Sequence, residues 1–168
     1  MTLIRPLTPD DAAIYHALRL EALAAEADSF VTTVEEQAGR SLEQVAKTLA
    51  ETTVFGAFID GELVGTAGYA RNTPAKEAHK GVVWGMYLRR SARGEGLAGA
   101  LLDTVIAYAR GKVEQLTLIV VSDNMPAVRL YESRGFIRWG LEPRALKLAD
   151  DRYTIDGYYW LPLTDPEA

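Results

Sequence analysis

The chain has 168 residues, of which 48% are hydrophobic and 24% are charged, and its formal net charge is −5 at pH 7. This composition predicts one globular domain spanning residues 1–168 and argues against broad binding to nucleic acids or anionic membranes. The absence of cysteine excludes disulfides, thiolate metal sites and a cysteine nucleophile. The N-terminus lacks an apolar leader and no apolar run is long enough to span a membrane, so we expect a cytoplasmic protein.

The hydrophobic pattern predicts strands and helices in a mixed order. A first strand (2–5) precedes two helices, from Thr8 to Ala25 and from Ser41 to about Leu49, with the acidic pair Glu35-Glu36 in the loop between them. Next come a hairpin (53–59 and 62–69), a strand (82–88), a helix (97–110), a strand (116–121), a helix (124–134) and two strands (136–141 and 153–163). This order predicts an α/β sheet that is antiparallel at one end and has a parallel pair in the middle.

The most informative segment joins the predicted strand 82–88 to the helix that begins at Leu97. The turn between them is basic and rich in glycine, with Arg93, Gly94 and Gly96 before the helix and Gly99 in its first turn. Backbone N–H groups at a helix N-terminus attract anions, and glycine lets a phosphate approach them closely. The segment therefore predicts a phosphate-binding turn.

The same glycines also match the dinucleotide fingerprint G-x-G-x-x-G. Only about 70 residues follow Gly99, too few for a doubly wound sheet with two mononucleotide-binding halves. A hairpin precedes the turn instead of a βαβ series. No carboxylate ends the next strand at the usual spacing, because Glu114 begins that strand and Asp123 comes late. Dinucleotide binding remains the weaker alternative.

Two motifs in order resemble the GNAT (GCN5-related) N-acetyltransferase family over nearly the whole chain. The cofactor motif of this family, Gln/Arg-x-x-Gly-x-Gly/Ala, corresponds to Arg93-Gly94-Glu95-Gly96-Leu97-Ala98, preceded by the strand Gly85-Met86-Tyr87-Leu88. The second motif, Asn-x-x-Ala-x-x-Leu-Tyr-x-x-x-Gly-Phe, corresponds to residues 124–136. The resemblance implies acetyl-CoA as cofactor and a mostly antiparallel sheet, whose central parallel pair is splayed at a bulge and flanked by about four helices.

The resemblance also implies which residues bind acetyl-CoA. Backbone N–H groups of the turn would hold the pyrophosphate, with the Glu95 side chain facing solvent. A bulge at Gly85 would expose the strand edge near Met86 and Leu88 to the pantetheine arm and to the thioester carbonyl. The residues expected at the cofactor are Met86, Tyr87, Leu88, Arg93, Gly94, Glu95, Gly96, Leu97, Ala98, Gly99 and Asn124.

The implied chemistry is direct attack of a neutral amine on the thioester in a ternary complex. Tyr131 occupies the position of the general acid of the family, which protonates the departing thiolate; otherwise it would be a core tyrosine. Glu35 or Glu36 is the candidate base for a protonated amine, although both also fit a solvated acidic loop. Asn124 also fits a helix cap. Neither His16 nor His79 has metal-ligand spacing, so no metal site is expected.

The sequence is compatible with more than one acceptor, with a catalytic or a binding role, and with more than one oligomeric state. The acceptor is an amine of a small molecule or a peptide, and the acidic balance favours a cationic one. A non-catalytic acyl-CoA-binding module fits the same motifs. Tyr69, Trp84, Tyr87, Tyr158 and Tyr159 are aromatic residues that either line the acceptor pocket or belong to the core. Both a monomer and a homodimer are compatible with the sequence.

Overall fold

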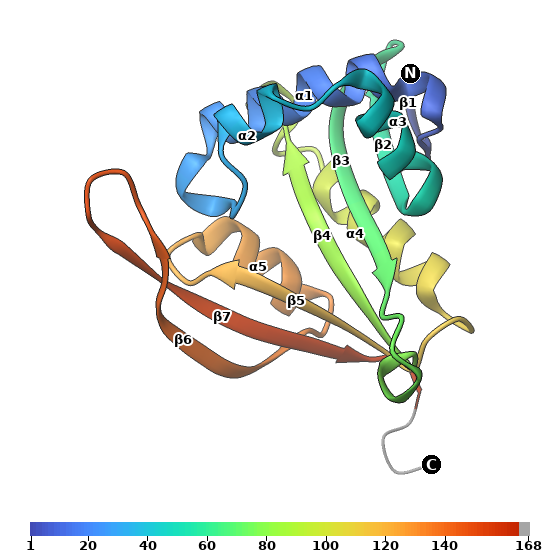
Figure 1. Cartoon of the computed structure of the whole chain (residues 1–168). Coiled ribbons are helices and arrows are strands. Elements are labelled where there is room, and N and C mark those ends of the chain that lie inside the picture. The colour runs from blue at the N-terminus through green and yellow to red at the C-terminus, as the bar shows by residue number, and fades with distance from the viewer. Residues whose placement is uncertain (165–168) are drawn as a thin grey trace.

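The computed structural model describes residues 1–164; the last four residues of the predicted domain lie outside the described part. The strands form one sheet in the order β1-β2-β3-β4-β5-β7-β6 (Figure 1). Their bounds are β1 Thr2–Pro6, β2 Thr53–Ile59, β3 Glu62–Arg71, β4 Lys80–Leu88, β5 Gln115–Val121, β6 Ile137–Lys147 and β7 Tyr153–Pro162. The α-helices are α1 Ala12–Ala25, α2 Val34–Ala38, α3 Leu42–Glu51, α4 Leu97–Ala109 and α5 Met125–Ser133.

The central pair, β4 and β5, is parallel while the other neighbouring strands are antiparallel, as the element order predicts. The two strands pair only from Lys80–Gln115 to Val82–Thr117, and Figure 1 shows them diverging beyond that point. The register of β4 against β3 shifts at the same level, where Gly85 has a φ of 60°. The predicted splay at a bulge is therefore confirmed. A doubly wound dinucleotide fold needs a run of parallel strands, which this sheet does not provide.

Two hydrophobic clusters lie on opposite faces of the sheet. One packs α4 and α5 against residues of β2 to β5 and β7, including Leu116, Leu118 and Val120 of β5. The other packs α1 and α3 against β2, β3 and β4 through Val54, Leu63 and other residues. On β5 the alternate residue Ile119 is exposed, because side chains along a strand point to opposite faces. The face of β5, β7 and β6 opposite α4 therefore has a largely open surface.

Capping and turn residues in the sequence explain most of the helix and strand boundaries. Ser41 caps α3 in a reciprocal capping box with Gln44, and the hairpin turn Asp60-Gly61 has positive φ at both residues, as a type I′ turn requires. Two features differ from prediction. The expected loop after α1 contains the extra helix α2, so five α-helices are found among residues 1–164 rather than about four. Strand β6 also continues past Leu141 to Lys147, because pairing with β7 sustains it despite Pro143.

Candidate active site

The glycine-rich turn lies between the end of β4 and the first turn of α4. Gly94 and Gly96 have φ values of 93° and 78°, and a Cβ at either position would meet no atom within 4 Å. The space beside the turn is therefore open. Gly96 is the N-cap of α4 and supplies no side-chain cap, and Ala100 N–H donates to the Gly96 carbonyl. The backbone N–H groups of the first turn of α4, before Ala100, therefore have no side chain that caps them. By contrast, Thr33, Ser41 and Asn124 cap α2, α3 and α5.

The side chain of Arg93 forms hydrogen bonds to two other parts of the protein. Its Nε donates to the Leu88 carbonyl at 2.8 Å, and its Nη2 donates to Glu26 of the segment after α1 at 2.9 Å. The first bond fixes the turn against the end of β4. The side chain of Glu95 is exposed, as predicted.

The third glycine of the turn makes room for an arginine that sequence reasoning did not single out. A Cβ at Gly99 would collide with the guanidinium of Arg134, which follows α5. The Arg134 Nε in turn pairs with Asp103 of α4 at 3.1 Å. Gly99 therefore permits close packing of α4 against Arg134, which adds a positive charge beside the first turn of α4.

The end of β4 presents an open backbone edge toward the splay. Arg89 N–H donates to the Val64 carbonyl of β3 at 2.8 Å. Because successive residues of a strand direct their N–H groups to opposite edges, the N–H of Leu88 points away from β3, toward the gap that β5 leaves. The Leu88 carbonyl accepts from Arg93 on that same edge. The side chains of Tyr87 and Leu88 are buried in the two clusters and Met86 packs against one of them, so only the backbone of these residues is available for binding.

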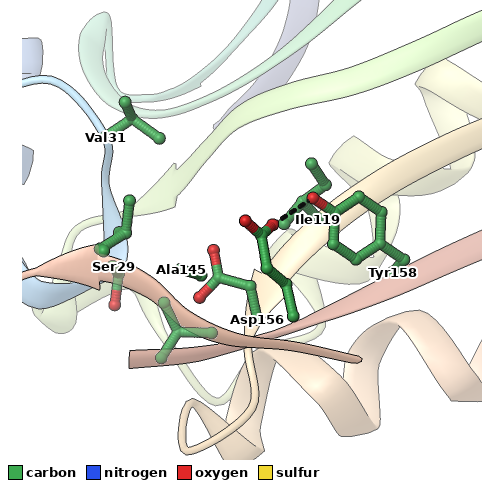
Figure 2. Close-up of a pocket in the computed structure, with 9 residues that line it drawn as sticks. Ser29, Val31, Ile119, Ala145, Asp156 and Tyr158 are labelled. Carbon is green, nitrogen blue, oxygen red and sulfur yellow. Dashed lines mark hydrogen bonds between the residues drawn. The ribbon is translucent and has the colours of Figure 1, made fainter. Parts of the chain in front are cut away.

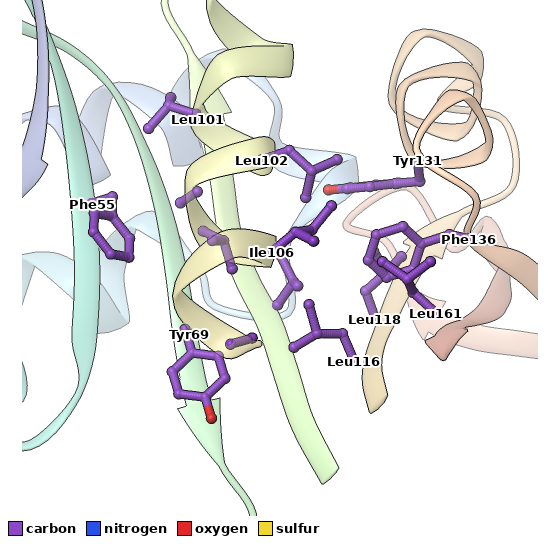
Figure 3. Close-up of a cluster of buried hydrophobic side chains, with 14 of the residues drawn as sticks. Phe55, Tyr69, Leu101, Leu102, Ile106, Leu116, Leu118, Tyr131, Phe136 and Leu161 are labelled. Atoms are coloured by element: carbon purple, nitrogen blue, oxygen red, sulfur yellow. The ribbon is translucent and has the colours of Figure 1, made fainter. Parts of the chain in front are cut away.

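Tyr131 lies on α5, with its ring buried in the cluster that includes α4. The ring packs edge-on against Phe136 at 5.9 Å between centroids. Figure 3 shows its hydroxyl directed away from Phe136 toward Leu102. Burial alone raises the pKa of the hydroxyl far above its usual value, and the hydroxyl receives no hydrogen bond from another residue of the described chain. Tyr131 therefore keeps its proton at physiological pH.

Asn124 occupies the N-cap position of α5, as the sequence predicts. Its Oδ1 accepts from Ala127 N–H at 3.4 Å, and its Nδ2 lies 3.4 Å from the Ser29 hydroxyl. This second contact joins the end of β5 to the segment that follows α1. Asn124 therefore lies where the end of β5 meets the segment that follows α1.

A cleft of about 290 Å³ opens on the sheet face opposite α4. Figure 2 shows side chains from β5, β6, β7 and the segment after α1 around it. Its lining includes Ser29, Val31, Ile119, Val121, Glu142, Ala145, Leu146, Asp156 and Tyr158. Apolar walls with two carboxylates suit a ligand that has both an apolar body and a positive charge.

Asp156 is the most buried acid of this cleft, with a 6% exposed surface. Its Oδ1 accepts from the Thr154 hydroxyl at 2.9 Å, and Leu146 N–H donates to that hydroxyl at 3.0 Å. Burial raises the pKa of Asp156, the Thr154 bond partly offsets this, and the nearby charge of Glu142 raises it further. Glu142 accepts a hydrogen bond from the Tyr158 hydroxyl across the cleft, drawn as a dashed line in Figure 2.

The acidic pair singled out from the sequence does not line this cleft. Glu35 and Glu36 are both exposed on α2. The Glu36 carboxylate accepts from Thr33 N–H at 2.9 Å in a capping box, so it already has a structural partner. Among the five aromatic residues considered, Tyr158 lines the cleft, whereas Tyr69, Tyr87 and Tyr159 are buried in the clusters and Trp84 is partly buried against one.

The chain is similar in sequence to known acetyltransferases. Residues 13–136 match the acetyltransferase (GNAT) family. The chain is 34% identical over 155 residues to a mycothiol acetyltransferase from Acidothermus cellulolyticus, an alignment that covers 82% of this chain and 44% of that protein. The chain spans about half the length of the curated relatives that it matches.

Solved structures share the whole fold. A GNAT family acetyltransferase from Streptococcus pneumoniae superposes with a TM-score of 0.87 at 22% identity, covering 96% of this chain and 99% of that one. The putative acetyltransferase yncA from Salmonella typhimurium, solved with its cofactor acetyl-CoA, has a TM-score of 0.84 at 19% identity, covering 99% and 96%. At these identities the likeness is one of fold.

Proposed function

This chain belongs to the acetyltransferase (GNAT) family, and from that premise we propose that it moves an acetyl group from acetyl-CoA to a primary amine. The observation that carries the proposal is that a gap between two strands lies next to an uncapped helix N-terminus. The parallel strands β4 and β5 part beyond Val82, and the uncapped first turn of α4 begins directly after β4. In acetyl-CoA the pantetheine arm suits the open strand edge and the pyrophosphate suits the helix N-terminus, so both features are needed side by side.

The residues fit acetyl-CoA in several respects. The space beside Gly94 and Gly96 is open, and we propose that their backbone N–H groups and those of Glu95, Leu97, Ala98 and Gly99 bind phosphate. Arg134 adds positive charge nearby, while Arg93 holds the turn in place. The outward N–H of Leu88 would pair with the pantetheine arm, and the N–H of Met86 on the same edge would stabilise negative charge on the thioester oxygen. Tyr87 lies between them, and its own N–H is directed toward β3. Asn124 would contact the same arm from α5.

Acetyl-CoA, when bound, supplies the acetyl group as an activated thioester. We propose direct attack by the acceptor amine, with Tyr131 as the general acid that protonates the thiolate of CoA. Burial raises the pKa of Tyr131, so its hydroxyl is protonated and would donate a hydrogen bond, and then the proton, to the sulfur as the carbon–sulfur bond breaks. The acceptor amine would lie in the cleft on the opposite face of the sheet.

A base must remove the proton from an ammonium group before it attacks. The sequence offers Glu35 and Glu36, and the structure adds Asp156. We favour Asp156, because it is buried in the cleft, its Oδ2 is free of the Thr154 bond, and its pKa is raised toward that of a useful base. Glu35 remains the exposed alternative on α2. The two carboxylates of the cleft favour cationic small molecules or peptide amines as acceptors.

The function is tested by release of free CoA thiol from acetyl-CoA across a panel of amines, amino acids and peptides. The protein has no cysteine, so its own thiols contribute no background. Thiol release with one acceptor class would support the proposal and identify the acceptor. A rise in melting temperature with acetyl-CoA, but no thiol release with any acceptor, would favour a non-catalytic acyl-CoA-binding module. Protection by NAD(P) instead would favour the dinucleotide alternative. Cytoplasmic location and a homodimer are further proposals.

A further inference from the structure

One buried charged residue, Arg19, has no role in the proposed reaction. Arg19 of α1 is 9% exposed, and its guanidinium makes no hydrogen bond within residues 1–164. Its Nη1 is sealed from solvent without a partner. Guanidinium remains protonated in proteins, so a largely buried positive charge has one donor, Nη1, without a partner among residues 1–164.

The surroundings of Arg19 do not neutralise this charge. The charged and titratable groups that act on it are the buried Tyr15 hydroxyl and the guanidinium of Arg40, and burial lowers its pKa. The Phe30 ring lies 5.1 Å from the guanidinium carbon. By contrast, Arg5 pairs with Asp11 at 2.8 Å and Arg89 with Glu21 at 2.7 Å. Burial of an unpaired charge is costly, so an unsatisfied buried donor in a native protein needs an explanation, and a bound anionic group is one that its position can test.

The position of Arg19 indicates what that partner is. A Cβ at the bulge residue Gly85 would lie 3.8 Å from Arg19 Nη1, so the guanidinium stands over the point where β4 leaves β5. Helix α1 covers the sheet face opposite α4, which is also the face of the cleft. Phe30, which stacks on Arg19, lies between Ser29 and Val31, and both of these line the cleft.

We propose that the acceptor carries a carboxylate close to its amine, and that Arg19 binds this carboxylate. This inference rests on the proposed acetyl transfer. An amino-acid acceptor would place its carboxylate on the guanidinium beside Gly85 and direct its ammonium, which is attached to the same carbon, into the cleft. Nε and Nη2 are the donors that solvent reaches, so they form the bonds to the carboxylate. A planar guanidinium matches a carboxylate with two parallel hydrogen bonds.

A structural role for Arg19 predicts a different result from a ligand role. In Arg19→Met, an apolar chain of similar length replaces an unpaired charge, so the melting temperature is expected to stay or to rise by about 2–4 °C. Arg40→Met is the matched control, because Arg40 donates to the Gln44 carbonyl at 3.0 Å and to the Thr48 hydroxyl at 2.6 Å. This control should lower the melting temperature. A clear fall in Arg19→Met would mean that Arg19 is structural and would overturn the proposal, whichever acceptors react.

The activity arm compares acceptors that differ only in the carboxylate: L-leucine with 3-methylbutylamine, and L-phenylalanine with 2-phenylethylamine. The wild type should acetylate each amino acid with a kcat/KM at least about tenfold above its amine, which corresponds to one charged hydrogen-bonded contact. Arg19→Met should remove that preference and leave the amines unchanged. Equal use of both members, or acetylation of peptide amines alone, would overturn the proposal while acetyl transfer stands. No thiol release with any acceptor would count against the proposed function itself.

Discussion

The two sides of the splay between β4 and β5 are built in different ways. The side proposed to hold acetyl-CoA comes mainly from one continuous stretch, residues 86–99, with α5 packed beside it. The acceptor side brings together Ser29, Glu142 and Asp156, which lie in three elements spread along the chain. The first side is defined by backbone N–H groups and glycines, and the second by side chains.

This difference explains how each side can vary. A backbone site recognises a group common to every acyl-CoA, and it tolerates side-chain substitutions that spare its glycines and the bond from Arg93 to the Leu88 carbonyl. An acceptor site made of side chains can change its preferred ligand through single substitutions on loops and strand ends. Substitutions can therefore disturb the two sides separately, and the largest effect is expected where a reacting group is removed.

Tyr131→Phe should have the largest effect, because it removes the general acid and keeps the ring packed against Phe136. We expect kcat to fall by about 10²–10⁴-fold, the usual range for such a group. The dissociation constant for acetyl-CoA, measured by calorimetry, should change little. A parallel loss of binding and rate would mean that Tyr131 is a packing residue.

Gly96→Asp should weaken acetyl-CoA binding by at least about tenfold, because it places a negative charge at the helix N-terminus where phosphate is expected. Gly111→Asp is a matched control at the other end of α4. Gly111 also has a positive φ, 76°, and open space around its Cα, so both variants carry similar backbone strain. Equal affinities in the two variants would place the phosphates away from the turn.

Asp156→Asn should abolish the acidic limb of the profile of kcat/KM against pH. Burial raises the pKa of Asp156, so the wild-type rate should rise with pH as this carboxyl loses its proton. The same shift predicts a stability effect. A raised pKa in the folded state favours folding below the unfolded pKa, and this contribution is lost as pH rises through the folded value.

The melting temperature of Asp156→Asn relative to wild type should therefore be higher at about pH 7 than at about pH 4. Thermal unfolding at both pH values checks this. An unchanged acidic limb in the variant would exclude Asp156 as the base.

Glu35→Gln should have the smallest effect, with kcat changed by less than about twofold, because an exposed carboxylate on α2 contributes little to a desolvated site. Glu36→Gln serves as the companion variant, since glutamine can still accept the Thr33 N–H in the capping box. Thiol release at neutral pH measures both. A tenfold fall in Glu35→Gln with a normal Asp156→Asn would reassign the base to α2.

The two sides also differ in how far the sequence predicts them. Gly94 and Gly96 lie in one short segment, so the residues alone predict the turn and the helix that follows it, whereas the splay and the role of Tyr131 are implied by the resemblance to the GNAT family. Asp156 and Glu142 come together only through the register of β6 on β7, and the sequence pattern ends β6 at Leu141. Hydrophobic periodicity also does not show that Arg19 is unpaired, because its neighbours Phe30 and Arg40 lie in the segment between α1 and α3.

Backbone amide hydrogen exchange with and without acetyl-CoA tests the central claim most directly. If acetyl-CoA lies in the splay, exchange should slow at Leu88 and at residues 94–99, whose N–H groups face the proposed ligand. The first turn of α3, already capped by Ser41, should remain unchanged and serves as the internal reference. Protection confined to other parts of the sheet, with no change in the glycine turn, would contradict the account.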